Sequence, residues 1–222
     1  MWWLSLMMIL KMIGDMKEPL SIKDIIENRK RAGLLAPPDE RIRVQIPNAR
    51  QVLMYGIVHF CGEQAQWLPE YEEVAEWLSD NQGKGILCLG QPGRGKTLIT
   101  QRILPVIFER CLHKMINCYI ALDLNGYDVD ERKKTHYRYD EIRKWKIIAI
   151  DDIGTEPQAC IFGETHDYFS ELVDCAEQKQ KMLILSTNLN RQKFIDRYGM
   201  RTFDRLTAIT RRVVFKGKSL RE

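Results

Sequence analysis

The octapeptide GQPGRGKT at residues 90–97 limits the folds open to this chain more than any other feature. It satisfies the pattern G-x-x-x-x-G-K-[ST], follows a strand-like apolar run at 86–89 and opens a helical stretch. Glycines let successive backbone N–H groups turn toward phosphate oxygens that side chains would block. The N terminus of the helix adds partial positive charge at the same place. We therefore predict a P-loop that binds a nucleotide.

The chemistry of this loop predicts ATP and Mg²⁺ as its ligands. Lys96 is placed to reach the β- and γ-phosphates, where its charge also serves catalysis, and the hydroxyl of Thr97 is placed to ligate the metal ion. The alternative is a glycine turn that matches the pattern by chance. The predicted nucleotide-binding residues of the loop are Gly90, Pro92, Gly93, Arg94, Gly95, Lys96, Thr97 and Leu98.

A second polar group follows the apolar run at 147–150. Asp151 and Asp152 come directly after it, where a buried parallel strand ends beside the P-loop. Asp151 is predicted to be the Walker B ligand of magnesium, and Asp152 is predicted to orient or deprotonate the attacking water. The alternative is a pair of aspartates that cap the next helix.

A third apolar run, at 182–185, leads into Ser-Thr-Asn and ends at Asn188. An asparagine in this place can hydrogen-bond the attacking water or the γ-phosphate, which makes Asn188 a candidate catalytic residue. The competing interpretation is an ordinary turn residue.

Short apolar runs alternate with helical stretches over the second part of the chain, which predicts an α/β fold with a parallel five-stranded sheet covered on both faces. The runs are 86–89, 117–122, 147–150, 182–185 and 213–215. Helices are predicted at 48–60 and 71–78, and a capping box begins another at Ser21. We place the boundary near residue 68, so that 1–67 is a helical appendage and candidate partner-binding segment, and 68–222 is the ATPase domain.

Composition sets looser limits. A net charge of +4 permits a nucleic-acid partner without demanding one. The six cysteines lack metal-ligand spacing, which favours reduced thiols and a cytoplasmic protein. The apolar residues 1–10 stop at Lys11, too early to span a membrane. Three interpretations stay open for them: a packed or partner-binding helix, a membrane-surface anchor, or an over-long gene start, which is slightly favoured.

Five segments together resemble the AAA+ ATPases of the DnaC/IstB type, the bacterial helicase loaders and transposition helpers. They are GQPGRGKT, IIAIDDIGTE, LSTNLN, YGMRTFDRL and FKGKSLR, and they span about residues 72–222. The resemblance implies that the sensor strand lies between the Walker A and Walker B strands, and that Asn188 is sensor 1. It also implies that Arg205 is an arginine finger acting on a neighbouring subunit, with Arg201 as the second choice, and that Arg221 is the sensor 2 arginine.

Two departures from that family bear on activity. Residues 189–222 leave no room for the usual helical lid, as in the short-tailed DnaC/IstB group. AAA+ proteins usually carry Glu after the Walker B Asp, whereas Asp152 is one methylene shorter. Glu156 is a candidate to assist it. Slow turnover and use as an ATP switch are both consistent with this.

The resemblance implies a helicase loader that forms a homo-oligomer on ATP or DNA and binds single-stranded DNA and a replicative helicase. Alternatives are a transposition helper that meets a transposase on duplex DNA, a small-molecule kinase, and an ATP-binding module with little turnover. No membrane partner is expected. The segment 132–139 mixes basic and aromatic residues and is a candidate DNA surface, although a solvated loop has the same composition. Its candidate residues are Arg132, Lys133, Lys134, His136, Tyr137, Arg138 and Tyr139.

Overall fold

The computed structural model describes residues 21–33, 40–125, 137–157, 159–161, 164–217 and 219–220. The chain forms two compact units, 1–39 and 40–222. In the first unit, helix α2 spans Ile22–Arg31. The predicted capping box begins it, because Asp24 N–H donates to the Ser21 hydroxyl oxygen and Asp24 accepts from Ser21 N–H.

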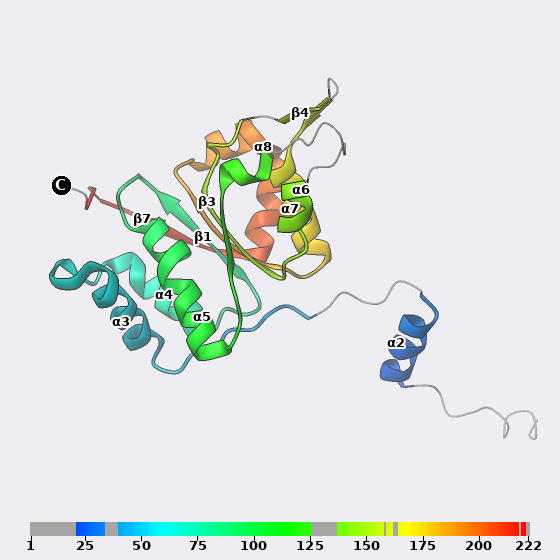
Figure 1. Cartoon of the computed structure of the whole chain (residues 1–222), viewed down its shortest axis with the longest axis horizontal. Coiled ribbons are helices and arrows are strands. Elements are labelled where there is room, and N and C mark those ends of the chain that lie inside the picture. Colours follow the sequence, from blue (N-terminus) through cyan, green and yellow to red (C-terminus); the bar gives the residue numbers. More distant parts are fainter. Residues whose placement is uncertain are drawn as a thin grey trace, which may run out of the picture. The chain divides into compact units, whose positions relative to one another are not determined.

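The second unit is built on a sheet of five parallel strands in the order β2-β3-β6-β1-β7 (Figure 1). The strands are β1 (Gly85–Gly90), β2 (Asn117–Ile120), β3 (Ile147–Ile153), β6 (Met182–Thr187) and β7 (Thr210–Phe215). β6 lies between β1 and β3, so the predicted fold and the predicted place of the sensor strand are confirmed.

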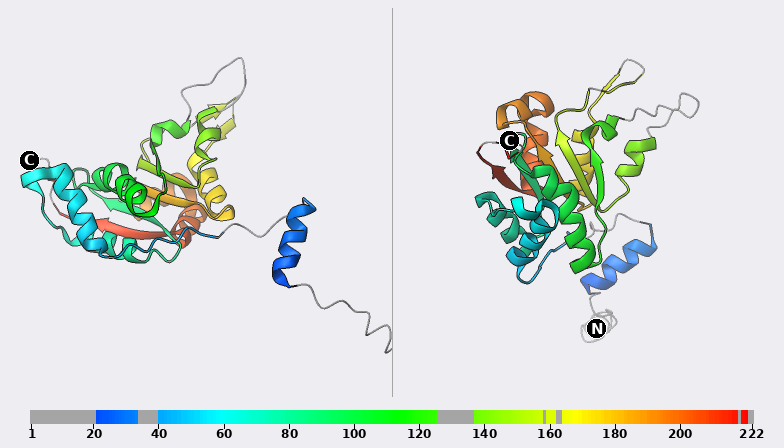
Figure 2. Two further views of the ribbon diagram at one scale, coloured as in Figure 1. Left: turned by 60° about the horizontal axis from the view of Figure 1, so that its bottom comes forward. Right: turned by 60° about the vertical axis from the view of Figure 1, so that its left-hand side comes forward.

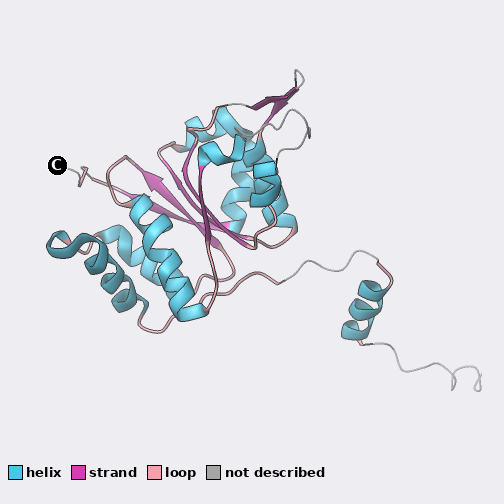
Figure 3. Ribbon diagram, in the orientation of Figure 1, coloured by secondary structure: helices cyan, strands magenta, loops and turns pink. Residues whose placement is uncertain are grey.

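Helices cover both faces of this sheet (Figures 2 and 3). The helices are α3 (Ala49–Cys61), α4 (Pro69–Ser79), α5 (Leu104–Leu112), α6 (Tyr137–Ile142), α7 (Tyr168–Gln178) and α8 (Arg191–Ile209). One core joins α3, α4 and α5 to the sheet, and a second joins α6, α7 and α8 to the other face. Apolar strands buried on both sides are what a parallel sheet of this kind requires.

Shorter elements join the strands and helices. A π-helical stretch at Leu98–Ile103 precedes α5, and 3₁₀ turns span Gly62–Gln64 and Ala121–Asn125. The strands β4 (Ala159–Ile161) and β5 (Glu164–His166) form a hairpin that the sequence pattern did not indicate. The strand predicted at 117–122 ends at Ile120. The N–H of Ile120 donates to the carboxylate of Asp123, where the chain turns.

The compact unit begins at Glu40, earlier than the boundary placed near residue 68. Val44, Leu53 and Ile57 are buried in the same core as α4 and α5. The side chain of Asn81 fixes the segment around Val44 that precedes α3, since its amide oxygen accepts from Val44 N–H at 2.8 Å. Residues 40–67 therefore complete one face of the ATPase fold.

Other expectations concern the ends of the chain and its cysteines. The C-terminal part supplies two helical segments and a strand as predicted, because α8 is kinked at Gly199 (φ 81°, ψ 160°) before β7.

Residues 1–10 lie outside the described part of the chain. None of the helices among the described residues is long and apolar enough to cross a membrane. Five cysteines that the structure describes are free thiols, namely Cys61, Cys88, Cys111, Cys118 and Cys175, and burial raises the pKa of Cys88 to about 12.

Candidate nucleotide-binding site

The P-loop leaves the carboxyl end of β1 and wraps around the buried ammonium group of Lys96. The loop has no space for side chains at its glycines. Gly95 has a φ of 85°, and a Cβ atom there would lie 2.8 Å from the hydroxyl oxygen of Tyr71. A larger residue would be strained both by the backbone conformation and by this contact. Glycine at this position fits the tight backbone turn that the predicted phosphate-binding loop requires.

Lys96 joins the P-loop to the end of β6. Its ammonium donates to the carbonyl oxygens of Gly90 and Gln91 at 2.8 and 2.9 Å, and to the side-chain oxygen of Asn188 at 2.8 Å. The residue is only 5% exposed. A buried ammonium needs oxygen partners, and phosphate oxygens would be stronger ones than neutral carbonyls. The geometry therefore fits a lysine that changes partners when a phosphate enters.

Thr97 and Asp151 form a second polar pair beside the loop. The Thr97 hydroxyl donates to Oδ2 of Asp151 at 2.8 Å. The hydroxyl of Ser186 in β6 donates to the other carboxylate oxygen, so both oxygens are held in place. Hard oxygen donors of this kind suit Mg²⁺, which normally completes its shell with water and phosphate oxygens. These residues fit the predicted metal site, although the role of Ser186 was not predicted.

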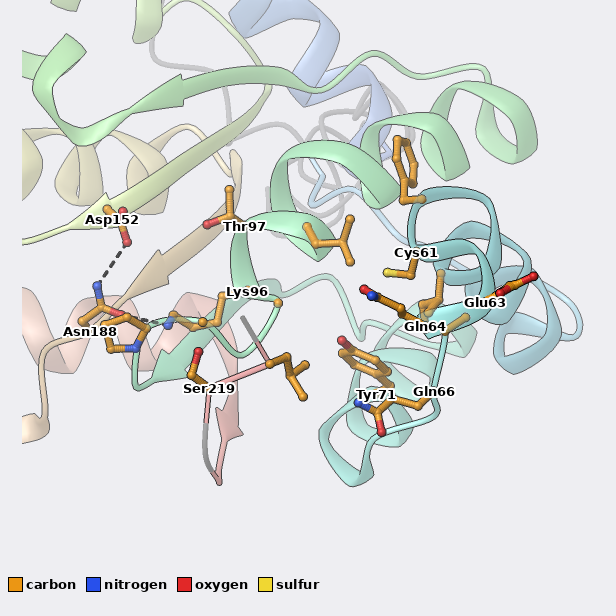
Figure 4. Close-up of a pocket in the computed structure, with 18 residues that line it drawn as sticks. Cys61, Glu63, Gln64, Gln66, Tyr71, Lys96, Thr97, Asp152, Asn188 and Ser219 are labelled. Atoms are coloured by element: carbon orange, nitrogen blue, oxygen red, sulfur yellow. Dashed lines mark hydrogen bonds between the residues drawn. The ribbon is translucent and has the colours of Figure 1, made fainter. Parts of the chain in front are cut away.

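Asp152 faces the pocket from the end of β3 and has a φ of 55°, uncommon for a residue other than glycine. Its N–H donates to the Ser186 hydroxyl oxygen at 3.0 Å. Its carboxylate accepts from the amide nitrogen of Asn188 at 3.2 Å (Figure 4). The amide of Asn188 thus bridges the P-loop lysine and the candidate catalytic carboxylate.

The pocket in front of these residues has a volume of about 930 Å³. One end holds Lys96, Thr97, Asp152 and Asn188, and the other is built from the end of α3, the start of α4 and the segment between them (Figure 4). The lining of that second end is Phe60, Cys61, Gln64, Ala65, Gln66 and Tyr71. A single cavity with a basic, polar end and a half-apolar end suits a nucleoside triphosphate, whose phosphates and base differ in the same way. The sequence offered no local motif for the second end.

The remaining loop residues differ in where their side chains lie. Pro92 and Leu98 line the pocket, as does Ser219 near the C terminus. The side chain of Arg94 is buried in an ion pair with Glu70 of α4 at 2.7 Å, so its charge is engaged there. Leu220 N–H donates to Gly93 O at 2.8 Å, which ties the segment after β7 to the loop.

Arg205 lies on α8 and is held by α7 of the same chain. Its guanidinium is paired with Asp174 and, at 3.3 Å, with Glu177, and the side chain is 28% exposed. The hydrogen bond that the Arg205 guanidinium donates to the Asp174 carboxylate raises the pKa of Arg205. Arg201 is 75% exposed and reaches Asp174 only at 3.5 Å. The arginine-finger assignment of Arg205 stays a prediction, and Arg221 lies outside the described residues.

Glu156, considered above as an aid to Asp152, is committed elsewhere. Its carboxylate accepts from Gly154 N–H at 2.9 Å and from the hydroxyl of Tyr198, and Arg197 lies 3.6 Å away. Burial next to this carboxylate raises the pKa of Tyr198, so the phenol stays protonated. Glu156 therefore anchors the loop after β3 to α8 and does not line the pocket.

The candidate DNA surface at 132–139 is only partly described. Residues 126–136 lie outside the described part of the chain. Tyr139 is buried, and its ring lies 4.6 Å from that of Tyr168. The inclusion of Tyr139 in a base-stacking surface was wrong, because the apolar face of α6 carries it into the core.

The strand order, the P-loop and the polar strand ends together define a P-loop NTPase fold of the AAA+ type. No family model matches the sequence, and a search of the curated proteins finds no match. Solved structures with a similar fold include the DnaC helicase loader, at 19% identity and a TM-score of 0.47 over 78% of this chain and 93% of that one. The structure of DnaI matches at 15% identity and a TM-score of 0.49, over 77% of this chain and 87% of that one.

AMPPCP-bound DnaA from Aquifex aeolicus matches at 20% identity and a TM-score of 0.47, over 64% of this chain and 45% of that one. The fold assignment rests on the strand order and site geometry of this chain itself.

The buried pair of Arg94 and Glu70 predicts how firmly the P-loop is held. Glu70→Ala leaves a buried guanidinium without this carboxylate and should lower the free energy of unfolding by about 3–5 kcal/mol. Glu76→Ala is the matched control on the same helix, since it removes an exposed ion pair with Arg211 and should cost about 0–1 kcal/mol. Urea unfolding measures both. Equal costs would show that the buried pair does not anchor the loop.

Proposed function

We propose that this chain is an ATPase of the helicase-loader type, which binds ATP with Mg²⁺ and acts on DNA together with a replicative helicase. The observation that carries the ATPase part is the meeting of Lys96, Asp152 and Asn188 in one pocket, with Thr97 and Asp151 paired beside it. Three separate segments of the sequence converge there. A chance glycine turn would not bring the other two strand ends to it.

The residues divide the chemistry in the following way. Backbone N–H groups of the loop and the ammonium of Lys96 bind the triphosphate, with Lys96 exchanging its carbonyl partners for phosphate oxygens. Thr97 and Asp151 hold the magnesium shell, and the bound ion neutralises charge that develops on the phosphates. Asp152 orients or deprotonates the attacking water, and Asn188 positions it.

Slow turnover is part of this proposal. The Asp152 side chain is short, and it already accepts a hydrogen bond from Asn188, which also accepts one from Lys96. A phosphate that draws Lys96 away would loosen Asn188 and with it Asp152. The pocket therefore has the features of an ATP switch whose hydrolytic step begins only after the triphosphate is bound.

The proposed helicase and single-stranded DNA partners are supported by the resemblance of the five sequence motifs to helicase loaders. A role in transposition shares those motifs and is the alternative. We propose that the chain acts in the cytoplasm as a homo-oligomer assembled by ATP or DNA, because Arg205 is predicted to act on the nucleotide of a neighbouring subunit.

An arginine finger predicts complementation between two inactive proteins. Arg205→Ala should keep ATP binding and lose turnover, since such fingers contribute roughly 10³–10⁵ in rate. Lys96→Ala should lose ATP binding yet keep its finger. A mixture of the two should regain part of the ATPase activity with single-stranded DNA present, because some interfaces join an intact pocket to an intact finger. Phosphate release measures this.

Two controls separate catalysis from structure. Asp174→Asn weakens the ion pair that holds Arg205 of α8 against α7. The variant keeps the arginine, so it should retain turnover. Arg201→Ala removes the neighbouring exposed arginine and should have a smaller effect. A mixture that stays inactive while light scattering shows co-assembly would exclude action of Arg205 in trans. A monomeric, fully active Arg205→Ala protein would favour the small-kinase alternative.

The choice of partner has its own test. The purified chain should co-elute in gel filtration with the replicative helicase of its host in the presence of ATP and Mg²⁺. The Lys96→Ala variant should not co-elute with the helicase under the same conditions. Co-elution with the host transposase instead would replace the loader by a transposition helper. Binding to neither protein would contradict both roles and leave the nucleotide pocket unaffected.

A further inference from the structure

Lysines gather at the edge of the sheet where the strands begin, which we call the amino edge. It comprises the three residues before each of four strands: 82–84 before β1, 114–116 before β2, 144–146 before β3 and 179–181 before β6. These twelve positions hold six lysines and neither Asp nor Glu. The lysines are Lys84, Lys114, Lys144, Lys146, Lys179 and Lys181. Because parallel strands start at the same edge, all six come together opposite the end of the sheet that bears the P-loop.

The two central segments of the amino edge are locked to each other. Lys146 Nζ donates to Lys179 O at 3.2 Å, and Lys181 Nζ donates to Trp145 O at 2.6 Å. Burial lowers the pKa of Lys181, and the charges of Lys179 and Lys146 lower it further, against an opposing contribution from Cys175. Like charges crowd this edge closely enough to disfavour one another, which is what a locally positive surface produces.

Large apolar side chains stand among these charges. Trp145 is 42% exposed, between the exposed Lys144 and the half-buried Lys146. Met115 is 76% exposed and follows Lys114 in the neighbouring segment. The pairing of Asn117 with Ile148 brings the segment before β2 beside the segment before β3. The indole is therefore an accessible aromatic surface within a row of ammonium groups.

We propose that the amino edge binds single-stranded nucleic acid, with phosphates against the exposed lysines and a base stacked on Trp145. Neighbouring strands lie about 4.8 Å apart, so lysines before successive strands form a row along which a phosphate backbone can run. A single strand also offers unpaired bases, which stack on aromatic side chains. This combination of a basic row and an indole is the recognition chemistry of single strands.

Duplex DNA and membranes fit the same edge less well. A duplex keeps its bases stacked on one another, which leaves Trp145 without a partner. Peripheral binding to a bilayer uses an amphipathic helix with a broad apolar face, whereas the apolar groups here are isolated side chains in strand-leading loops. The proposal deepens the DNA-binding part of the proposed function and does not depend on ATP hydrolysis, because the edge and the pocket lie at opposite ends of the strands.

The first test reverses charge at two of the three exposed lysines of the amino edge, Lys144 and Lys179. Lys144→Glu/Lys179→Glu should weaken binding of a fluorescent single-stranded oligonucleotide, measured by anisotropy, by tenfold or more. The slope of log affinity against log salt should fall by about 1.4, since each phosphate contact on a single strand contributes about 0.7. Arg102→Glu/Lys193→Glu makes the same change of charge at exposed positions outside the amino edge and should keep most of the affinity.

The second test concerns the indole. Trp145→Ala should lower affinity for the oligonucleotide about fivefold to 100-fold with an unchanged salt slope, and Trp145→Phe should restore part of it. Every variant should bind a fluorescent ATP analogue like the unaltered chain, which also shows that it is folded. If the unaltered chain does not bind the ATP analogue, the proposed ATPase function is contradicted, whereas the proposal for the amino edge is not.

Three results would overturn the proposal. The first is equal oligonucleotide affinity in the Lys144→Glu/Lys179→Glu protein and its charge-matched control. The second is duplex binding as tight as single-strand binding and equally sensitive to Trp145→Ala. The third is co-sedimentation with phosphatidylserine vesicles that depends on these residues while oligonucleotide binding does not, which would make the edge a membrane surface.

Discussion

The Lys96 ammonium is the group on which the arrangement of this site depends. It is buried, and a buried cation requires acceptors that the fold has to deliver. Two of them come from its own loop and the third is Asn188 at the end of β6. That third contact exists only because β6 pairs directly with β1, so the strand order and the position of the charge are one constraint.

The same adjacency organises the carboxylates. β6 also pairs with β3, and Ser186 uses this position to donate to Asp151 and to accept from the N–H of Asp152. Asn188, two residues further on, accepts from Lys96 and donates to Asp152. A triphosphate that attracts Lys96 would act on the candidate catalytic carboxylate of Asp152 through one amide, which is the physical basis of the proposed switch.

The phosphate end of the site could be predicted from the sequence because its residues follow strands in short local patterns. Lys96 belongs to a contiguous motif, and Asp151 ends an apolar run. The candidate nucleoside end could not be predicted, since it depends on α3 packing against α4 and α5, and residues 40–67 carry no strand pattern. Glu70 gave no signal either, because an acidic residue in a first helical turn is usually solvated, whereas here it is buried in a tertiary ion pair with Arg94.

The central claim is that this pocket holds a nucleotide together with magnesium through Thr97 and Asp151. Isothermal titration of the full chain with ATPγS, in Mg²⁺ and in EDTA, tests it most directly. We expect one site per chain, at least tenfold weaker binding in EDTA, and loss of that difference in Thr97→Ala. Equal affinity with and without Mg²⁺, or no binding in either buffer, would contradict the account.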